Sequence, residues 1–310
     1  MNSENKRIFN ACESDAGLRV DKFLASRMPE FSRSEIQKMI DGKYKPAGKV
    51  HDGDVFRIEI PEQQTTTLDP QASDLDILYE DEDIIAVNKP RGVVMYPAAG
   101  NPDGTLVQMV LAHCGLSALG DANRPGVVHR IDKGTSGAVI FAKTDAAHRA
   151  LTKTFAAHDL VRKYVCLCWG VPQWEGADIT GNIGRSAKNR QKMTIVKIGG
   201  RPAKTHADVM AAWPRKNASE LKCTLFTGRT HQIRVHLSAH GFPIICDPVY
   251  GRDKIGTIKD SELLDFVKNN NEQMLHAQYL ELTHPVKGIK IKIKAPLPDD
   301  MRLLRDILDN

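Results

Sequence analysis

The stretch Val127–Gly137, VVHRIDKGTSG, carries a single carboxylate, Asp132, between two apolar runs. Two valines precede it, and the run GAVIFAKT follows it. This pattern predicts a strand, a tight loop and a second strand, with Asp132 at the bend and Gly134 and Gly137 allowing the chain to turn. A loop held by rigid strands is a common place for one reactive side chain. A loop aspartate more often stabilises its own turn by accepting hydrogen bonds from the following amides, so both interpretations of Asp132 remain open.

A second polar cluster lies further along the chain, in TGRTHQIRVHLSAHG, residues 227–241. Arg229, His231, Gln232 and Arg234 stand within six positions and have apolar residues between them. An amphipathic surface segment would show the same spacing. Two arginines beside His and Gln at a predicted strand-to-helix junction nevertheless suit the recognition of phosphate or carboxylate groups.

The composition indicates an ordinary globular protein. Its 310 residues predict about two domains, and 41% hydrophobic residues are enough to form a core. No apolar run approaches the ~20 residues of a membrane span, and the polar N-terminus has neither a signal-peptide nor a transit-peptide pattern. The six cysteines include no C-x-x-C pair. We therefore expect a cytoplasmic protein with reduced cysteines and no membrane partner.

Cofactor motifs are missing from the sequence. It contains no G-x-x-x-x-G-K-[ST] and no G-x-G-x-x-G, so we expect no nucleotide cofactor. His236 and His240 have the i, i+4 spacing of zinc ligands, but the chain has no H-E-x-x-H glutamate and no cysteine pair to complete a zinc site. We therefore expect no metal.

The order of the predicted elements indicates an α+β fold with mostly antiparallel strands. Residues 1–16 are expected to be a tail, and 17–62 a small unit whose first helix has Val20, Phe23, Leu24 and Met28 on one face. A capping box at Ser32 and Glu35 begins a second helix, and a strand with Phe56, Ile58 and Ile60 follows. The polar segment 63–74 is a predicted linker, and 75–310 form the larger, strand-rich domain.

Two stretches carry an excess of positive charge. Between residues 18 and 50 there are eight Lys or Arg and four acids, which fits an ordinary solvated helix pair and a nucleic-acid-binding module equally well. Residues 181–207 contain seven Lys or Arg and no acid. An unbroken basic run of this length favours a loop or hairpin that faces a polyanion.

Several separated motifs, in the expected order, resemble the RluA family of pseudouridine synthases, and the RluD-type enzymes of the bacterial large ribosomal subunit most closely. The motifs are GDANRPGVVHR, HRIDKGTSG, KYVCLCWG, GRPAKTH, TGRTHQIRVHL and LHAQYLELTHPVKG. The resemblance extends over residues 17–310. It implies a pseudouridine synthase domain, with a mixed, mostly antiparallel sheet, flanking helices and a central cleft, preceded by a small S4-like RNA-binding domain.

The chain departs from the family pattern at three places. After QKMIDGK the usual hairpin with a V-N-G turn is missing, so that either the S4-like domain is truncated or residues of it are absent from this sequence. Gly134 stands where an acid is common in the family. Met95-Tyr96-Pro97 stands where His-Pro is common.

The resemblance implies a role for four residues. Asp132 matches the aspartate that acts at the reacting uridine, and Arg234 matches the arginine that pairs with it. Tyr164 matches the tyrosine that stacks on the target base and is a candidate for the late proton step. Arg130 matches the arginine that enters the RNA stack where the uridine left. RNA contacts are further expected at Lys133, Arg229, His231, Gln232, Arg19, Arg33, Lys38, Arg185, Arg190 and Lys192.

The implied reaction needs no cofactor, because the N1–C1′ bond breaks, uracil turns, and C5 joins C1′ with no change in atoms or redox state. The stacked uridine must flip out. Asp132 must be ionised, and the Arg234 guanidinium favours the charged form. Whether Asp132 attacks C1′ or removes the 2′ proton stays open. The expected substrate is 23S rRNA or a pre-50S particle, modified by a monomer.

Two other function classes fit parts of the sequence. A non-catalytic RNA-binding ribosome-assembly factor on the same fold would carry the same basic stretches. Hydrolysis of a glycosidic bond would want a second carboxylate near Asp132, and none is visible around these motifs.

Overall fold

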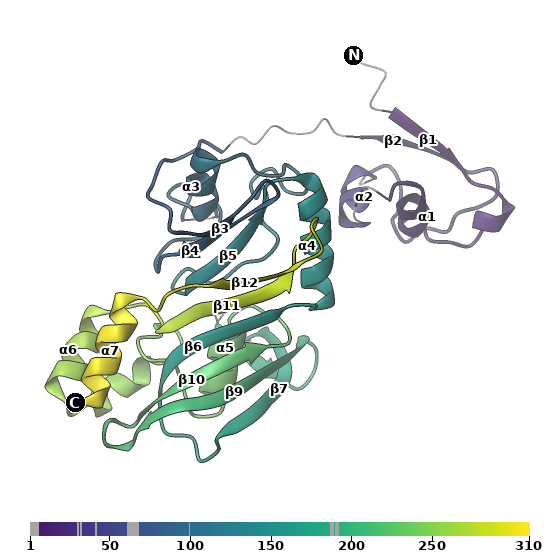
Figure 1. Ribbon diagram of the computed structural model, residues 1–310. Coiled ribbons are helices and arrows are strands. Elements are labelled where there is room, and N and C mark those ends of the chain that lie inside the picture. The colour runs from purple at the N-terminus through teal and green to yellow at the C-terminus, as the bar shows by residue number, and fades with distance from the viewer. Residues whose placement is uncertain are drawn as a thin grey trace. The chain divides into compact units, whose positions relative to one another are not determined.

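The computed structural model describes residues 6–29, 31, 33–40, 42–60, 68–98, 100–186, 189 and 192–310. The chain divides into two compact units, Met1–Thr65 and Thr66–Asn310, here called the N-terminal unit and the C-terminal unit. Figure 1 shows the elements of each. None of the helices within the described ranges combines the length and the apolar content that crossing a bilayer requires.

The N-terminal unit packs two short helices, α1 (Val20–Arg27) and α2 (Arg33–Met39), with an antiparallel pair of strands, β1 (Lys6–Asn10) and β2 (Val55–Glu59). A 3-10 turn at Glu13–Asp15 precedes α1. The predicted helix face is confirmed, because its apolar side chains are buried together with those of α2 and β2: Phe23, Leu24, Met28, Ile36, Phe56 and Ile58. Ser32 of the expected capping box lies outside the described residues.

The expected N-terminal tail is wrong for residues 6–10. These residues form β1, and every one of them pairs with β2. Only Phe9 of the strand packs against the apolar core, so its pattern is too weak to predict a strand from the sequence. The backbone hydrogen bonds of the β2 edge hold it in place instead.

Asp21 organises the polar side of the N-terminal unit. Its side chain is fully buried and accepts hydrogen bonds from Arg19, Arg33 and Gln37. Burial works to raise the pKa of the Asp21 carboxyl, but the hydrogen bonds from these arginines hold it well below its usual value. Two of the cations expected to contact RNA are therefore paired within the fold, although both side chains remain partly exposed.

The C-terminal unit is built on one mixed sheet in the order β3-β4-β5-β11-β6-β10-β9-β7-β8, with β12 added alongside β11. Of the strand pairs in the described ranges, β5–β11 is parallel and the others are antiparallel, so the expected mostly antiparallel sheet is confirmed. The strands are β3 (Ile77–Glu80), β4 (Ile84–Lys89), β5 (Ser136–Ala142), β6 (Val161–Trp169), β7 (Gly176–Arg185), β8 (Met193–Val196), β9 (Arg201–Trp213), β10 (Ala218–Leu225), β11 (Leu275–Thr283) and β12 (Lys290–Lys294).

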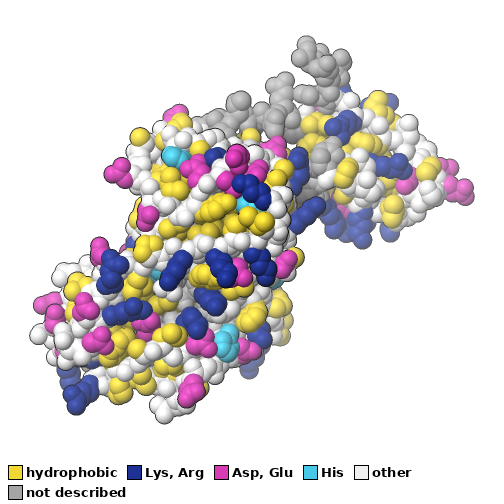
Figure 2. Space-filling view, in the orientation of Figure 1, with side chains coloured by type: hydrophobic (Ala, Val, Ile, Leu, Met, Phe, Trp, Pro, Cys, Tyr) yellow, Lys and Arg dark blue, Asp and Glu magenta, His cyan; other side chains and the backbone are white. Residues whose placement is uncertain are grey.

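Helices cover parts of this sheet and its ends (Figure 1). The helix α4 (Asp145–Ala157) packs Ala147, Leu151 and Phe155 on one side of β5. On β12 the isoleucines point inward and the lysines outward, and Figure 2 shows Lys and Arg side chains over the middle of this sheet. The helices are α3 (Leu106–His113), α4 (Asp145–Ala157), α5 (Gln232–Ala239), α6 (Ser261–Asn269) and α7 (Asp299–Asp309).

The expected strand before Asp132 is reduced to a single bridge, between Val127 and Phe141. The chain then leaves the sheet, because Ile131 turns into the main core rather than pairing. After the loop, Gly137 has φ +116°, and a side chain there would meet the backbone of Ala277 at 2.3 Å. Only glycine therefore lets β5 approach β11 this closely.

The second half of the expected linker belongs to the C-terminal unit. The Gln71 amide N–H donates to the carbonyl of Gln108, and its side-chain oxygen accepts from the N–H of Gly104 at 2.8 Å. Leu68 packs against the main core. Residues 61–67, with the first half of the linker, lie outside the described residues.

Candidate active site

A cleft of about 550 Å³ opens in the C-terminal unit beside the loop that carries Asp132. Its walls come from this loop, from the end of α4, from β6 and from the connection between β10 and α5. Asp132, Tyr164 and Arg234, which are far apart in the sequence, all line it. The structure thus brings together the three residues that the sequence predicted to meet.

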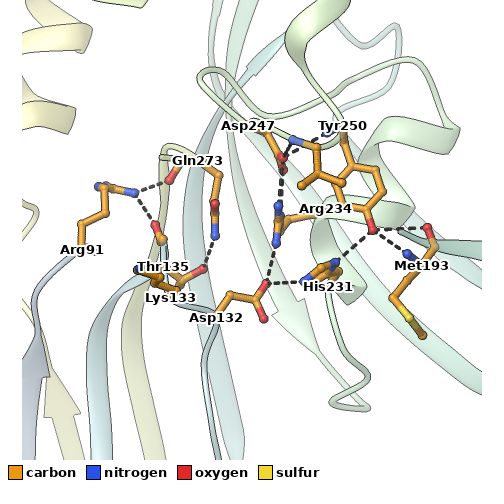
Figure 3. Close-up of polar contacts among 12 residues, drawn as sticks. Arg91, Asp132, Lys133, Thr135, Met193, His231, Arg234, Asp247, Tyr250 and Gln273 are labelled. Atoms are coloured by element: carbon orange, nitrogen blue, oxygen red, sulfur yellow. Dashed lines mark hydrogen bonds and ion pairs between the residues drawn. The ribbon is translucent and has the colours of Figure 1, made fainter. Parts of the chain in front are cut away.

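Arg234 joins two carboxylates (Figure 3). Its Nη1 donates to Oδ2 of Asp132 at 3.0 Å, while Nε and Nη2 donate to the two oxygens of Asp247 at 2.8 and 2.9 Å. Asp247 is completely buried, whereas the Asp132 side chain keeps 19% of its surface exposed toward the cleft. Burial works to lower the pKa of Arg234, but Asp247 and Asp132 raise it above its usual value. The guanidinium is therefore a fixed positive charge beside Asp132.

Asp247 was not predicted from the sequence. The N–H groups of Val249 and Tyr250 also donate to it, at 2.9 and 3.0 Å, so its oxygens are fully used in holding Arg234 and its own turn. Only the chain order CDPVYG, with an aspartate before a turn, hints at this role, and many loops share that pattern.

The loop after Asp132 is held by its backbone carbonyls. The Lys89 ammonium is completely buried and donates to the carbonyls of Pro90, Val93 and Lys133 at 2.7–2.9 Å. Arg91 donates to the carbonyls of Gly134 and Gln273 and pairs with Asp300. Burial lowers the pKa of Lys89 to about 7. This support has no signal in the sequence, because the contacts are to main-chain atoms.

Gly134 lies against the ends of two side chains. A side chain at this position would lie 2.4 Å from Oε2 of Glu272 and 2.5 Å from Oε1 of Gln273. Gln273 in turn donates to the hydroxyl of Thr135 at 3.1 Å. A larger residue at this position would therefore require the ends of Glu272 and Gln273 to move.

His231 connects Asp132 to Tyr250 (Figure 3). Its Nε2 lies 3.9 Å from Oδ2 of Asp132, and its Nδ1 lies 3.0 Å from the Tyr250 hydroxyl, which also bonds the backbone of Met193. Burial lowers the pKa of the imidazole, and Asp132 works in the opposite direction. His231 therefore lies directly beside Asp132. The expectation from the sequence was only that it contacts RNA.

Tyr164 lies in β6 with its side chain 9% exposed and facing the cleft. Burial raises the pKa of its hydroxyl to about 12. The phenol is therefore protonated at neutral pH, and it offers the cleft an aromatic ring and a hydrogen-bond donor.

Arg130 extends from the loop into solvent and is held by Tyr96. Its Nη1 donates to the Tyr96 hydroxyl at 2.8 Å, and the guanidinium of Arg124 lies 4.2 Å from the centre of the same ring. Tyr96 is the residue that stands in place of the family's usual histidine. In this chain it positions the arginine that the resemblance assigns to the RNA stack.

Gln232, for which an RNA contact is expected, has its side chain bonded within the fold. The side chain is 3% exposed. Its amide donates to the Lys204 carbonyl and the Thr205 hydroxyl, both at 3.0 Å, and its oxygen accepts from Thr227 and from the N–H of Arg229. All of its hydrogen-bonding capacity is used in fixing the start of α5 against β9.

The remaining cations expected to contact RNA lie on several elements. Lys133 is exposed next to Asp132 and donates to Asn101, and Arg229 lines the cleft. Arg185 is exposed at the end of β7, and Lys192 lies over the Tyr250 ring. The basic stretch contains the β7–β8 hairpin. Lys38 lies in α2, and Arg190 lies outside the described residues.

A family model described as RNA pseudouridylate synthase matches residues 83–239, which include the Asp132 loop, Tyr164 and Arg234. The chain belongs to this family. It is 41% identical to "Ribosomal large subunit pseudouridine synthase D" of Zymomonas mobilis, with 96% of this chain and 95% of the relative covered. The Escherichia coli protein of the same name is 36% identical over 96% of this chain and 92% of its own length.

Solved structures agree. The human RNA pseudouridylate synthase domain containing 1 superposes with a TM-score of 0.56 and 25% identity, covering 76% of this chain and 95% of the human one. As a pseudouridine synthase, the chain is an isomerase that acts on RNA. The non-catalytic alternative is therefore not favoured.

Proposed function

We propose that this chain isomerises specific uridines of the large-subunit (23S) rRNA to pseudouridine, as a monomer in the cytoplasm, with Asp132 as its catalytic carboxylate. Relatives that cover nearly the whole chain are named as synthases of the large ribosomal subunit. The observation that carries the proposal is the Asp132–Arg234–Asp247 arrangement at the base of an arginine-lined cleft.

Asp132 acts in its charged form. Attack on C1′ and removal of the 2′ proton both start from a carboxylate, and the Arg234 guanidinium stabilises it from 3.0 Å away. Because Asp247 holds the other edge of the guanidinium, Arg234 cannot follow Asp132 when the latter reacts. The carboxylate oxygen that does not bond Arg234 remains available to the ribose.

The cleft receives a flipped uridine. Extruding a base costs a few kcal/mol, and stacking on Tyr164 offsets part of this cost. Arg130, exposed and held by Tyr96, fills the vacated position in the RNA stack. The Tyr164 ring packs against one face of the flipped base. From this position its hydroxyl takes part in the late proton transfer.

The N-terminal unit serves as a second RNA contact of the S4 type. Arg19 directly precedes α1 and Arg33 begins α2, and their side chains are 40% and 47% exposed despite the pairing with Asp21. Because phosphate contacts need only one exposed edge of a guanidinium, these arginines bind Asp21 and RNA at once.

Conversion of Asp132→Asn tests the central assignment. Asparagine keeps the size and the hydrogen bond from Arg234 but has no charge, so we expect RNA affinity to change little and pseudouridine formation to fall by ~10³-fold or more. Pseudouridine is mapped in the rRNA of a deletion strain complemented with each variant. Asp265→Asn, an exposed acid of α6, is the matched control and keeps full activity.

The result separates two functions. If the wild-type chain forms no pseudouridine in any bacterial RNA, the proposal is wrong. If Asp132→Asn complements the deletion as well as the wild type does, the chain acts as an RNA-binding assembly factor instead.

A further inference from the structure

Arg162 is a buried cation whose role the catalytic arrangement does not explain. It lies in β6 two residues before Tyr164, lines the cleft, and is 9% exposed. Its Nε and Nη2 atoms are both buried, and neither has a hydrogen-bond partner among the residues that the structure describes. Buried polar atoms are nearly always paired in folded proteins, and a buried unpaired charge is costlier still.

The two unpaired atoms form one edge of the guanidinium, the edge that binds oxyanions with two parallel hydrogen bonds. Arg234 uses this same edge, Nε and Nη2, to hold both oxygens of Asp247. Arg162, which lines the same cleft, therefore keeps unpaired the edge that Arg234 has already filled. The missing partner is an anion with two oxygens.

Among the residues that the structure describes, none supplies this anion. Five arginines line the cleft, namely Arg130, Arg162, Arg201, Arg229 and Arg234, against the single carboxylate of Asp132, which is bound to Arg234. Burial lowers the pKa of Arg162, Tyr164 works in the opposite direction, and the neighbouring Arg229 lowers it further. A group of cations that outnumbers its acids is a site for a polyanion.

His158 and Gly228 complete the surroundings of Arg162. His158, at the end of α4, lines the cleft with its Nδ1 buried and also without a partner within the described ranges. A side chain on Gly228 would lie 2.8 Å from Nη1 of Arg162, so the glycine leaves room for the guanidinium. Burial lowers the pKa of His158, and Arg162 and Arg229 lower it further, so the imidazole is a neutral hydrogen-bond donor at pH 7.

We propose that Arg162, together with Arg229 and His158, binds one backbone phosphate of the RNA next to the flipped nucleotide. This proposal rests on the proposed function, since it assigns the part of the substrate that this end of the cleft holds. A uracil carbonyl would accept one hydrogen bond but would leave the buried charge unbalanced, whereas a phosphate supplies both charge and two acceptors. The flipped base is thereby oriented by its own backbone.

The first experiment measures the salt dependence of RNA affinity for the full chain and for Arg162→Gln. Losing one phosphate contact lowers the slope of log affinity against log salt concentration by about 0.7–0.9 and weakens binding at low salt by about tenfold. Lys163→Gln is the matched control: it is the next residue of β6, it lies over the Tyr279 ring rather than in the cleft, and its slope stays that of the wild type. An unchanged slope in Arg162→Gln overturns the proposal.

The second experiment identifies the phosphate. The phosphates around the target uridine are replaced one at a time by neutral methylphosphonates. Wild-type affinity falls at one position next to the uridine, and Arg162→Gln is insensitive at that position only. Arg162→Lys, which keeps the charge but not the two-pronged edge, restores part of the loss. A variant that responds like the wild type at every phosphate contradicts the inference.

Thermal unfolding distinguishes binding from a structural role. Because the guanidinium is unpaired, removing its charge is expected to leave the melting temperature unchanged or to raise it. A clear fall in the melting temperature of both Arg162→Gln and Arg162→Lys would show that the residue holds the fold instead. If the wild-type protein modifies its RNA but both variants bind RNA as the wild type does, this inference alone is wrong. If the wild-type protein forms no pseudouridine, the proposed function is wrong.

Discussion

The N-terminal unit and the cleft of the C-terminal unit both bury charge, but they satisfy it differently. Asp21 is fully buried and accepts hydrogen bonds from two arginines and an amide, so that the carboxylate itself is closed to a ligand. In the cleft, Asp132 keeps one exposed face, and Arg162 keeps an unpaired edge. A saturated buried charge stabilises the fold, whereas an unsaturated one is retained at a cost to stability and marks where a charged substrate binds.

Asp247→Asn gives the largest effect that we expect among the supporting residues. The side chain keeps its size but loses the charge that holds one edge of Arg234, so the guanidinium can shift away from Asp132. We expect kcat for pseudouridine formation to fall about 100-fold, with little change in KM, since misplacement of a catalytic group by 1 Å can cost this much. Single-turnover kinetics measure the change.

Asp247 acts through position rather than contact with RNA, and a second readout checks this. RNA affinity of Asp247→Asn stays close to that of the wild type, and Asp265→Asn changes neither quantity. A variant with full kcat would mean that the Asp132–Arg234 contact does not depend on Asp247. The difference between the fully bonded Asp21 and the partly exposed Asp132 would then have no connection to catalysis.

Asp21→Asn breaks the saturated cluster. Removing the charge leaves Arg19 and Arg33 without their buried partner, and breaking such a pair costs about 3 kcal/mol. Hydrogen exchange on the full chain detects this as lost protection in α1 and α2, while the C-terminal unit keeps its protection. Glu59→Gln, an exposed acid of β2, is the control and leaves exchange unchanged. Equal loss of protection in both units would contradict the division of the chain into separate units.

His236 tests whether an unpaired neutral atom also marks a ligand site. It is completely buried on α5, its Nδ1 bonds Thr205, and its Nε2 has no partner within the described residues. Burial lowers its pKa from 6.5 to about 4. Between these two values the unfolded chain binds a proton that the folded chain does not, so the free energy of unfolding falls as the pH falls, by about 1.4 kcal/mol per pH unit.

Chemical denaturation at pH 7, 6 and 5 measures this dependence. In His236→Asn the decline between pH 6.5 and 4 becomes shallower. His206 affects stability in the opposite direction, because its hydrogen bond to Asp178 raises its pKa in the folded state. Its contribution to the free energy of unfolding is complete below pH 6.5 and is lost as the pH rises through the pKa of the folded state. If His236→Asn alters RNA affinity rather than acid stability, the unpaired nitrogen belongs to a binding site.

Tyr96→Phe gives the smallest expected effect. It removes the hydroxyl that accepts from Arg130 but keeps the ring beneath Arg124. Losing one hydrogen bond to a partly exposed cation costs about 1 kcal/mol, so kcat/KM falls about fivefold. Steady-state kinetics on an rRNA fragment measure it. A combined Tyr96→Phe, Arg130→Ala variant no worse than Arg130→Ala alone confirms that the hydroxyl acts through Arg130.

Local patterns were enough for much of the fold. The 3.6-residue spacing in α1 and the alternation in β2 predicted both the elements and their buried faces, because these signals depend on neighbours within a few residues. β1 was missed, since it is stabilised by pairing with β2, about fifty positions away in the chain. The hydrogen bonds of Gln232 have no local signal for a related reason: its partners Lys204 and Thr205 lie in β9.

The sequence by itself determined the family, because its short motifs follow one another along the chain, and these motifs made Asp132, Tyr164 and Arg234 the candidate site residues. The tertiary structure alone decided what each of these residues meets. The contact of Asp132 with Arg234 joins residues 102 positions apart, and neither Asp247 nor the unpaired edge of Arg162 has a local signal. Whether a buried charge is satisfied depends on every element packed around it, which only the folded chain brings together.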